Sequence, residues 1–260
     1  MSADLLTLER LNKSFGPVGV LHDVDFAVRA GEVVALVGDN GAGKSTLVKC
    51  IAGIHGIDSG TLRFEGEQIH LSGPRAAADL GIEVVYQDLA LADNLDIVQN
   101  MFLGREKGSK WFLDEGTMEE QARSALASLS VRTINSVRQP VSALSGGQRQ
   151  TVAIAKSVLW ESKVILLDEP TAALGVAQTR QVLDLVRRLA EQGRGVVLIS
   201  HNLADVFEVA DRIAVLYLGR MVAELATKEV TQNQVVQLIT SGRSSELGID
   251  RPETVTVGTV

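Results

Sequence analysis

Apolar runs and amphipathic segments alternate along most of this chain. Three runs are continuously apolar, which is the pattern of strands buried on both faces of a sheet; they are residues 33–37, 164–167 and 195–200. Helical spacing of apolar residues follows the first at 46–52 and the second at 182–189, where i, i+3, i+4 and i+7 are apolar. This alternation of strand and helix predicts an α/β core around a parallel sheet.

Other segments have the shorter period of antiparallel strands. Partial alternation marks 5–11 and 20–28, and two hairpins are predicted, 61–65 with 68–71 and 213–217 with 220–223. Further helices are predicted at 74–80, 95–103 and 115–129, with a strand at 82–86 between the first two and a last helix that Thr231 and Gln234 begin as a capping box. We therefore expect one domain over 5–240, made of the core, an antiparallel β layer and a helical insert at about 88–160. The polar tail 241–260 is expected to fray.

Composition restricts the classes of function. The chain has 260 residues and a net charge of −7, which disfavours a general nucleic-acid binder. A single cysteine, Cys50, excludes an internal disulfide framework and lies on the apolar side of a predicted helix, where core packing explains it. No apolar run approaches the ~18 residues of a membrane span and the start lacks a signal-peptide pattern, so we expect any membrane role to act through a partner.

A glycine-rich loop joins the first apolar run to the helix that follows it. It has the spacing G-x-x-x-x-G-K-S and consists of Gly38, Asp39, Asn40, Gly41, Ala42, Gly43, Lys44, Ser45 and Thr46. Glycines allow positive φ and close approach of the backbone, so successive N–H groups can surround an anion at the positive end of a helix. Lys44 is predicted to bind the β- and γ-phosphates and Ser45 to give one oxygen to Mg²⁺. The alternative, a tight turn that caps an ordinary helix, explains fewer of these residues.

Two acids, Asp168 and Glu169, end the apolar run 164–167. The carboxyl ends of parallel strands are where ligands bind in open α/β sheets. There Asp168 can hold Mg²⁺, directly or through a water, and Glu169 can accept a proton from an attacking water. The alternative is a pair of solvated acids at a strand end.

A second candidate anion site consists of Ser145, Gly146, Gly147 and Gln148. Alone, Ser145 and Gln148 form a capping box before a helix. A hydroxyl and two glycine N–H groups at a helix N-terminus can also bind phosphate. Because one triphosphate does not need two such sites, the second is expected to serve a nucleotide held by another copy.

With these motifs in their order, the sequence resembles the ATP-binding subunits of ABC transporters over roughly residues 5–240. The Walker A loop is 38–46, the signature is 144–148 and Walker B is 164–169. Gln87 stands at the position of the Q-loop glutamine, and His201, directly after the third apolar run, at that of the switch histidine. Without this context, a plain surface or core role would be the first interpretation of His201.

The resemblance implies a P-loop NTPase with a RecA-like core that hydrolyses ATP with Mg²⁺. Two copies would sandwich two ATP molecules between one copy's 38–46 loop and the other's 145–148 loop. It implies that Glu169 is the general base, that His201 contacts the γ-phosphate, and that Gln87 senses Mg²⁺ and the attacking water. Phe15, which from its sequence context stacks on a purine or caps a small core, becomes a better candidate for adenine stacking. Residues 88–105 are expected to meet the coupling helices of an integral-membrane permease.

The subtype is indicated by 100–106 and by the stretch that ends at Gly175, which resemble the ATPases of bacterial monosaccharide importers of the ribose, xylose and fructose kind. A chain with one ATPase unit would work as a homodimer, peripheral at the cytoplasmic face of the inner membrane, with the sugar recognised by a periplasmic binding protein and the permease. Gly175 departs from the family, since an aspartate usually stands there, and this puts crosstalk between two sites through that carboxylate in doubt.

Other classes share these motifs. One alternative is an ABC ATPase for another small solute, and another is a soluble ABC-type ATPase acting on ribosomes or DNA. The acidic balance and the absence of heptads disfavour the soluble class. A nucleotide-gated binding module without turnover would have no use for Glu169 and His201, and an exporter half would be expected to carry membrane helices.

Overall fold

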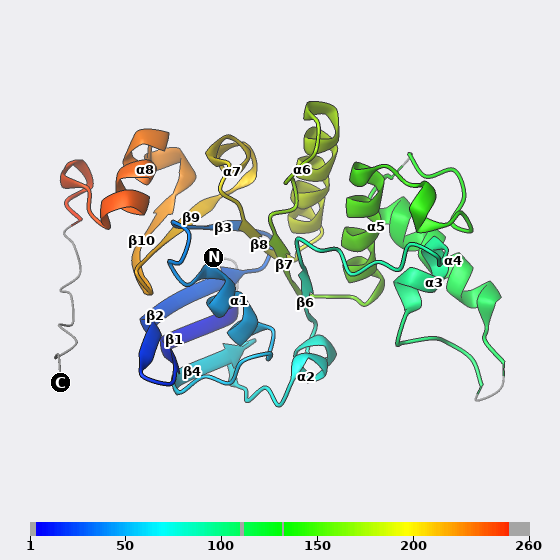
Figure 1. Cartoon of the computed structure of the whole chain (residues 1–260), viewed down its shortest axis with the longest axis horizontal. Coiled ribbons are helices and arrows are strands. Elements are labelled where there is room, and N and C mark those ends of the chain that lie inside the picture. The colour runs from blue at the N-terminus through cyan, green and yellow to red at the C-terminus, as the bar shows by residue number, and fades with distance from the viewer. Residues whose placement is uncertain (1–3, 110–111, 132, 250–260) are drawn as a thin grey trace.

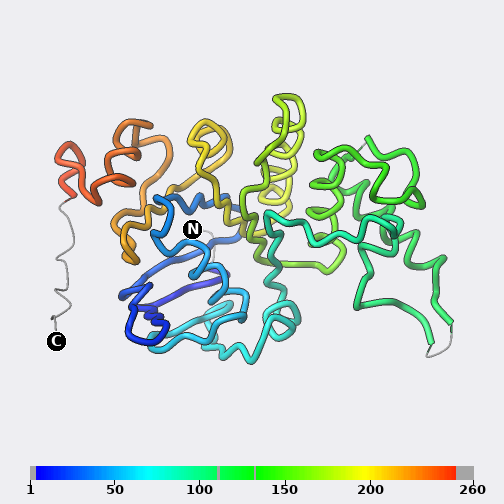
Figure 2. Tube along the Cα trace, in the orientation of Figure 1, coloured from blue at the N-terminus to red at the C-terminus, as the bar shows by residue number. Residues whose placement is uncertain are grey.

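A sheet of mostly parallel strands carries one antiparallel sheet on one side and a helical lobe beyond its edge (Figures 1 and 2). The computed structural model describes residues 4–109, 112–131 and 133–249. Helices α6, α7 and α8 lie along one face of the main sheet, while α1 lies between the two sheets. The predicted α/β class with an antiparallel β layer is confirmed.

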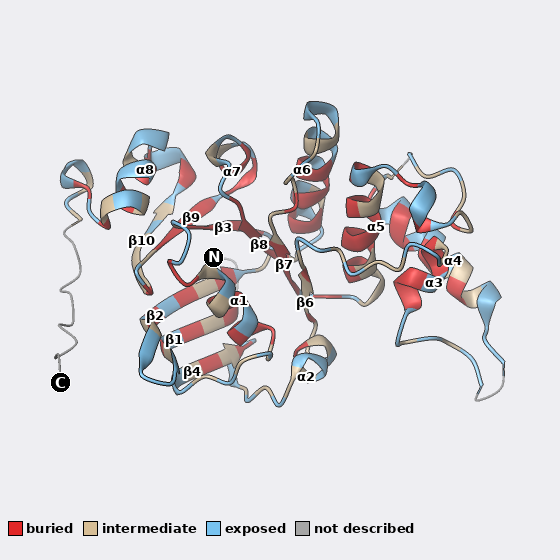
Figure 3. Cartoon of the chain, in the orientation of Figure 1, coloured by how far each residue is buried: buried red, intermediate tan, exposed pale blue. Residues whose placement is uncertain are grey.

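The three continuous apolar runs become neighbouring strands at the centre of the main sheet. The order of its strands is β10 (Arg220–Ala226), β9 (Arg212–Tyr217), β3 (Val33–Val37), β8 (Gly195–Ile199), β7 (Val164–Asp168) and β6 (Ile82–Val85). β10 is antiparallel to β9, and the other pairings are parallel. Every residue of β3 and β8 is buried (Figure 3). Val34 and Leu36 face one hydrophobic core and Val33, Ala35 and Val37 the other, which explains the lack of a polar period.

The second sheet is antiparallel, in the order β2 (Val18–Arg29), β1 (Asp4–Phe15), β4 (Ser59–Phe64) and β5 (Glu67–Gln68). β1 and β2 are longer than their alternating segments because several register shifts interrupt the period without ending the pairing. The second strand of the first hairpin, predicted at 68–71, is only two residues long, so that part of the prediction is wrong. The other predicted hairpin is confirmed by β9 and β10.

Most helices agree with the predicted segments to within a few residues, but α6 begins six residues before the predicted stretch 182–189 and α7 has no counterpart among the predicted segments. They are α1 (Lys44–Ile51), α2 (Pro74–Asp79), α3 (Ile97–Phe102), α4 (Glu115–Ser128), α5 (Gly146–Leu159), α6 (Val176–Glu191), α7 (Leu203–Val209) and α8 (Gln232–Ser241). Between β6 and β7, helices α3, α4 and α5 form the helical lobe. The capping box of Thr231 and Gln234 begins α8 as predicted. Among the described residues, none of the helices is long and apolar enough to cross a membrane.

The first part of the polar tail packs on the domain. Residues 244 and 249 form a β-bridge around a 3₁₀ turn (Ser245–Leu247), and Leu247 and Ile249 contact the core. The expected fraying is therefore wrong for residues 242–249, because two apolar side chains pay for ordering them. Residues 250–260 lie outside the described part of the chain.

Two single residues complete the fold. Cys50 is buried on α1, and burial raises the pKa of its thiol to about 11, as expected for a packing role. Arg212 of β9 joins the two sheets, because its guanidinium donates to Glu32 Oε1 at 2.7 Å and to the carbonyl oxygen of Ala27 at 2.5 Å, at the end of β2. It also pairs with Glu224 of β10.

Candidate functional site

The glycine-rich loop leaves the buried strand β3 and enters α1 directly. Gly38 (φ +158°), Gly41 (φ +81°) and Gly43 (φ +105°) all have positive φ, as predicted. A Cβ on Gly38 would lie 2.3 Å from the carbonyl oxygen of Leu216, and one on Gly43 would lie 2.9 Å from Leu21 Cδ2. Neighbouring strands therefore leave no room for side chains at these two positions. Two N–H groups of the loop are engaged within it, since the Asn40 N–H donates to Asp39 Oδ1 at 2.7 Å and the Ala42 N–H to the Asp39 carbonyl oxygen at 3.1 Å.

Lys44, the first residue of α1, bends back over the loop. Its Nζ donates to the carbonyl oxygens of Gly38 at 2.7 Å and Asp39 at 3.0 Å. Burial lowers the pKa of Lys44, while the nearby charges of Glu169, Asp39 and Asp168 raise it. The ammonium is thus held in a partly buried position at the mouth of the loop. Asp39, Asn40 and Ser45 are exposed, Thr46 is half-buried and Ala42 is buried.

Asp168 and Glu169 lie at the carboxyl end of β7, as predicted. Burial, followed by the charge of Glu169, raises the pKa of Asp168, while Lys44 and Lys49 oppose this shift. Glu169 has φ +52°, and its N–H donates to the carbonyl oxygen of Ile199 at 2.9 Å. The interaction of both carboxylates with Lys44 indicates that the structure brings the glycine-rich loop and the end of β7 together.

His201 follows β8, the strand next to β7. Its Nδ1 lies 2.7 Å from Glu169 Oε2. The histidine side chain is 76% exposed and the glutamate side chain 16%. His201 is therefore on the surface, one of the two plain roles considered for it. It is also paired with Glu169, the predicted base, and the rest of its side chain is exposed.

Gln87 and Phe15 lie at the margins of the site. Gln87 is exposed directly after β6, next to Tyr86, whose pKa is raised by burial and then by the charge of Asp168. Phe15 ends β1 and is 44% exposed, with its ring 5.0 Å from that of His55 in an edge arrangement. This exposure disfavours the core-capping role of Phe15, whose ring also has Lys13 Nζ 5.3 Å from its centroid.

The signature residues begin α5 in the helical lobe. Ser145 is the N-cap: the Gln148 N–H donates to Ser145 Oγ at 3.3 Å, and the Ser145 N–H donates to Gln148 Oε1 at 2.9 Å, which confirms the capping box. Gln148 also donates from Nε2 to the carbonyl oxygen of Thr133 at 2.6 Å. Figure 1 shows α5 well apart from α1, beyond the β7 and β6 edge of the sheet. Residues 145–148 thus lie away from the chain's own 38–46 loop.

The turn that contains Gly175 packs on the signature. The Gly175 N–H donates to Gln178 Oε1 at 2.8 Å, which caps α6 from its own third residue. A Cβ on Gly147 would lie 2.8 Å from Gln178 Cγ. Gly147 is therefore required for the close packing of α6 on α5, a constraint that the sequence does not reveal.

Sequence reasoning missed one group of polar residues near Glu169. Thr171 Oγ1 donates to Asp205 Oδ2 at 2.6 Å, and Asn202 Nδ2 donates to Asp205 Oδ1 at 2.9 Å. An acid in the first turn of a short helix is ordinary, so Asp205 gives no signal in the sequence. The only pointers are that Thr171 follows Glu169 by two residues and that Asn202 follows His201 directly.

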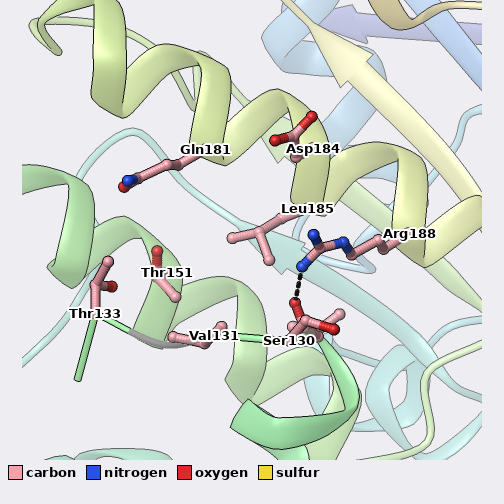
Figure 4. A pocket seen from close by; sticks show the side chains of 9 residues that line it. Ser130, Val131, Thr133, Thr151, Gln181, Asp184, Leu185 and Arg188 are labelled. Carbon is pink, nitrogen blue, oxygen red and sulfur yellow. Dashed lines mark hydrogen bonds between the residues drawn. The ribbon is translucent and has the colours of Figure 1, made fainter. Parts of the chain in front are cut away.

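A cavity of about 400 Å³ lies between the helical lobe and α6 rather than beside the glycine-rich loop (Figure 4). Its wall between α5 and α6 includes Thr151, whose hydroxyl donates to the Gly147 carbonyl oxygen at 2.8 Å. Arg188 of α6 reaches across to the Leu129 carbonyl oxygen. None of its lining residues is a predicted site residue. They are Leu129, Ser130, Val131, Thr133, Thr151, Gln181, Asp184, Leu185 and Arg188.

The sequence is similar to one known family and to several proteins of known kind. The sequence model of one family, described as ABC transporter, matches residues 21–172. The chain is 47% identical to a xylose/arabinose import ATP-binding protein, XylG, of Sulfolobus acidocaldarius, and 46% identical to a fructose import ATP-binding protein, FrcA, of Rhizobium meliloti. In both cases the similarity covers 92% of this chain and 95% of the relative. A ribose import ATP-binding protein, RbsA, of Lacticaseibacillus paracasei is 41% identical, and the matched part is 46% of its length.

Solved structures have the same fold. A crystal structure of a nucleotide-free ATP-binding cassette from an ABC transporter matches with a TM-score of 0.80 and 25% identity, over 95% of this chain and 100% of the other. A cassette in its ADP conformation matches with a TM-score of 0.79 and 26% identity, over 94% and 98%. The architecture described above is thus that of an ATP-binding cassette.

Proposed function

Because this chain belongs to the ABC transporter family, as an ATPase of that family, we propose that it drives monosaccharide import through a membrane permease. The observation that carries the ATPase chemistry is the meeting of Lys44, Asp168 and the Glu169–His201 pair at one edge of the sheet. Its relatives are named as import ATP-binding proteins for xylose and arabinose, fructose or ribose, which supports a monosaccharide as the solute.

The donor set fits Mg²⁺. Ser45 offers a hydroxyl and Asp168 a carboxylate, the hard oxygen ligands that this ion prefers. Burial, and then the charge of Glu169, raises the pKa of Asp168, so a bound cation would favour its ionised form. Bound Mg²⁺ would be such a cation and would neutralise the phosphates of ATP. Ser45, Asp168 and, through its amide oxygen, Gln87 are the residues that we propose would hold it.

The chain's own residues then have separate tasks in hydrolysis. Lys44 and the N–H groups of 38–46 bind and orient the phosphates, and Glu169 accepts the proton of the attacking water. His201 fixes the Glu169 carboxylate from one side and turns its exposed side toward the γ-phosphate. Phe15 offers its exposed ring to the adenine.

We propose that the site is completed by a second copy of the chain. Ser145–Gln148 lie away from the chain's own loop 38–46, so they are free to bind the nucleotide of a partner. A homodimer with two-fold symmetry would pair each loop with the other signature and give two equal sites. Gly175 has no carboxylate to contribute between them.

The remaining partners follow from the importer hypothesis. Residues 88–105, which follow Gln87 and include α3 of the helical lobe, are proposed to dock on the permease at the cytoplasmic face of the membrane. A periplasmic binding protein would select the sugar and would act on this subunit only through the permease. Nucleic acid is not expected as a partner, since the net charge is −7.

Purification of a tagged subunit from membranes tests this proposal. Recovery of a polytopic permease and a sugar-binding protein is expected, and the ligand of that binding protein would identify the solute. An amino-acid or other solute would correct the solute class and leave the importer. Recovery with ribosomes or DNA-repair factors and no permease would overturn the transport function while leaving the ATPase chemistry intact.

A further inference from the structure

Asp205 is a buried carboxylate between the two loops that carry Glu169 and His201. It lies in the first turn of α7 and is 5% exposed. Both of its oxygens are used: Oδ2 accepts from Thr171 Oγ1 at 2.6 Å, and Oδ1 accepts from Asn202 Nδ2 at 2.9 Å. One side chain therefore bridges the turn after β7 and the turn after β8.

A role for Asp205 in capping its own helix does not explain these contacts. The cap of α7 is Asn202, whose Oδ1 accepts from the Ala204 N–H at 3.1 Å. The Asn202 N–H in turn donates to Ser200 Oγ at 3.1 Å. Asp205 thus holds the capping residue itself, and through it the segment that begins with His201.

The other loop needs such support because its backbone is strained. Glu169 has φ +52° and Ala173 φ +59°, and left-handed conformations of this kind cost energy in residues other than glycine. Thr171 lies between them. Its hydroxyl bond to Asp205 adds a side-chain link to this turn, beside the backbone bonds of Ala172 to Glu169 and of Leu174 to Thr171.

We propose that Asp205, with Thr171 and Asn202, is a positioning residue that sets the geometry of Glu169 relative to His201. The Thr171–Asp205–Asn202 bridge acts on the pair through the backbone, since Thr171 follows Glu169 by two residues and Asn202 follows His201 directly. The inference rests on the roles proposed above for Glu169 and His201. When the bridge is lost, Glu169 relaxes from its left-handed conformation and its carboxylate leaves the position from which it accepts the water proton.

The chain offers two matched pairs of variants for the test. Thr171→Val removes the hydroxyl and keeps the shape, whereas Thr171→Ser keeps the hydroxyl. Asp205→Ala removes both hydrogen bonds of the bridge, whereas the amide of Asp205→Asn can accept from Asn202 and donate to Thr171. Steady-state ATP hydrolysis gives kcat and KM, and a fluorescent nucleotide analogue gives the binding affinity.

We expect Thr171→Val to lower kcat about tenfold and Asp205→Ala up to about a hundredfold, the range that displacement of a catalytic group produces. KM and nucleotide affinity should change less than about twofold, because the phosphate loop is not touched. Thr171→Ser and Asp205→Asn should restore kcat to within about threefold. The double variant Thr171→Val/Asp205→Ala should be no slower than Asp205→Ala alone, since both act through one bridge.

Controls separate positioning from general stability. Thr240→Val on α8 and Asp184→Ala on α6 change the same residue types at exposed positions and should leave kcat unchanged. Thermal unfolding midpoints identify variants that simply unfold. For these, the conservative variant of the same residue, Thr171→Ser or Asp205→Asn, still tests the effect of the hydrogen bond on kcat. A wild-type kcat in a folded Asp205→Ala variant would overturn the bridge, provided that Glu169→Gln is inactive. Activity in Glu169→Gln would instead overturn the assignment of the base.

Discussion

The short contact between Glu169 and His201 is the feature from which single-residue effects at this site are best argued. A carboxylate that accepts a proton must lie where its charge is needed, and here the imidazole holds it from one side at 2.7 Å. The pKa values of Lys44 and Asp168 also reflect the close packing of charged groups at this site. Burial is the leading cause in both, lowering the pKa of the lysine and raising that of the aspartate.

Glu169→Gln keeps the shape of the side chain and removes the base. We expect ATP binding to be retained while hydrolysis falls by about 10²–10⁴, the usual contribution of general base catalysis. The unhydrolysed nucleotide should trap a dimer. Phosphate release and size-exclusion chromatography with ATP measure the two effects, and an unchanged rate of hydrolysis would remove Glu169 from this role.

Asp168→Asn should make the nucleotide-free, metal-free protein more stable at neutral pH. The pKa of Asp168 is raised above its ordinary value of 3.8 by burial and by Glu169, so the folded state binds this proton more tightly than the unfolded chain. Its contribution to stability is therefore present in full below the unfolded pKa and is lost as pH rises through the folded one. The asparagine avoids that loss.

The stability gain from Asp168→Asn should accordingly shrink as pH falls toward 4, because the wild-type carboxyl is then protonated too. Unfolding midpoints measured between pH 4 and 7.5 give the difference. Adding MgATP should raise the midpoint of the wild type more than that of the variant. A gain that grows on acidification would contradict this account of the carboxyl.

At the scale of elements, burial decides what the sequence could predict. The runs that form β3, β7 and β8 are buried on both faces, so their apolar pattern has no competing interpretation. The glycine-rich loop and the acids after β7 could be placed for the same reason, since each directly follows one of these strands. The apolar pattern did not predict strand length where strand pairing, not burial, sets that length, as in β5, which has two residues. It also failed for Leu247 and Ile249, whose core contacts are made across the fold.

Long-range polar contacts within the site could not be predicted. Asp205 meets Thr171 across 34 residues, and Gly147 meets Gln178 across 31, with ordinary local patterns at both ends. The same holds for Arg212 and Glu32, which tie the two sheets together from positions 180 residues apart. Such pairs become visible only when the strand order is known.

Arg212→Met tests how much this tie contributes. The side chain of Arg212 is 10% exposed and that of Glu32 12%, and removing Arg212 leaves the buried Glu32 carboxylate with Arg29 at 4.0 Å in place of the contact at 2.7 Å. We expect the free energy of unfolding to fall by about 3–5 kcal/mol, as for other broken buried ion pairs. Denaturant titration measures it. Arg123→Met, at an exposed pair with Glu119, should cost at most about 1 kcal/mol. Equal losses of unfolding free energy in the two variants would show that Arg212 contributes no more to stability than an arginine in a surface ion pair.

At the scale of the molecule, the two lobes hold the two proposed phosphate-binding motifs apart, so that one chain would not use both on one nucleotide. The 38–46 loop lies at the core and 145–148 on the helical lobe, apart from each other (Figure 1). If each site is composite, it combines the 38–46 loop of one chain with residues 145–148 of the other. A defect in the loop and a defect in residues 145–148 then disable different halves of a site. Two inactive variants should then rescue each other in a mixed dimer, which is not possible if each chain works alone.

Lys44→Ala and Gly146→Asp form such a pair. The first removes the phosphate cation, and the second places a carboxylate at an exposed position where a Cβ lies 3.4 Å from Leu174 Cδ2, an ordinary contact. Each variant alone should lack ATPase activity. A 1:1 mixture should recover about a quarter of the wild-type rate, because half of randomly assorted dimers are mixed and each of these holds one intact site. Hydrolysis by Gly146→Asp alone at the wild-type rate would show that the chain acts without a partner's signature and would overturn the composite site. If both variants are inactive alone and the mixture stays inactive although differently tagged chains show mixed dimers, one intact site does not turn over beside a dead one.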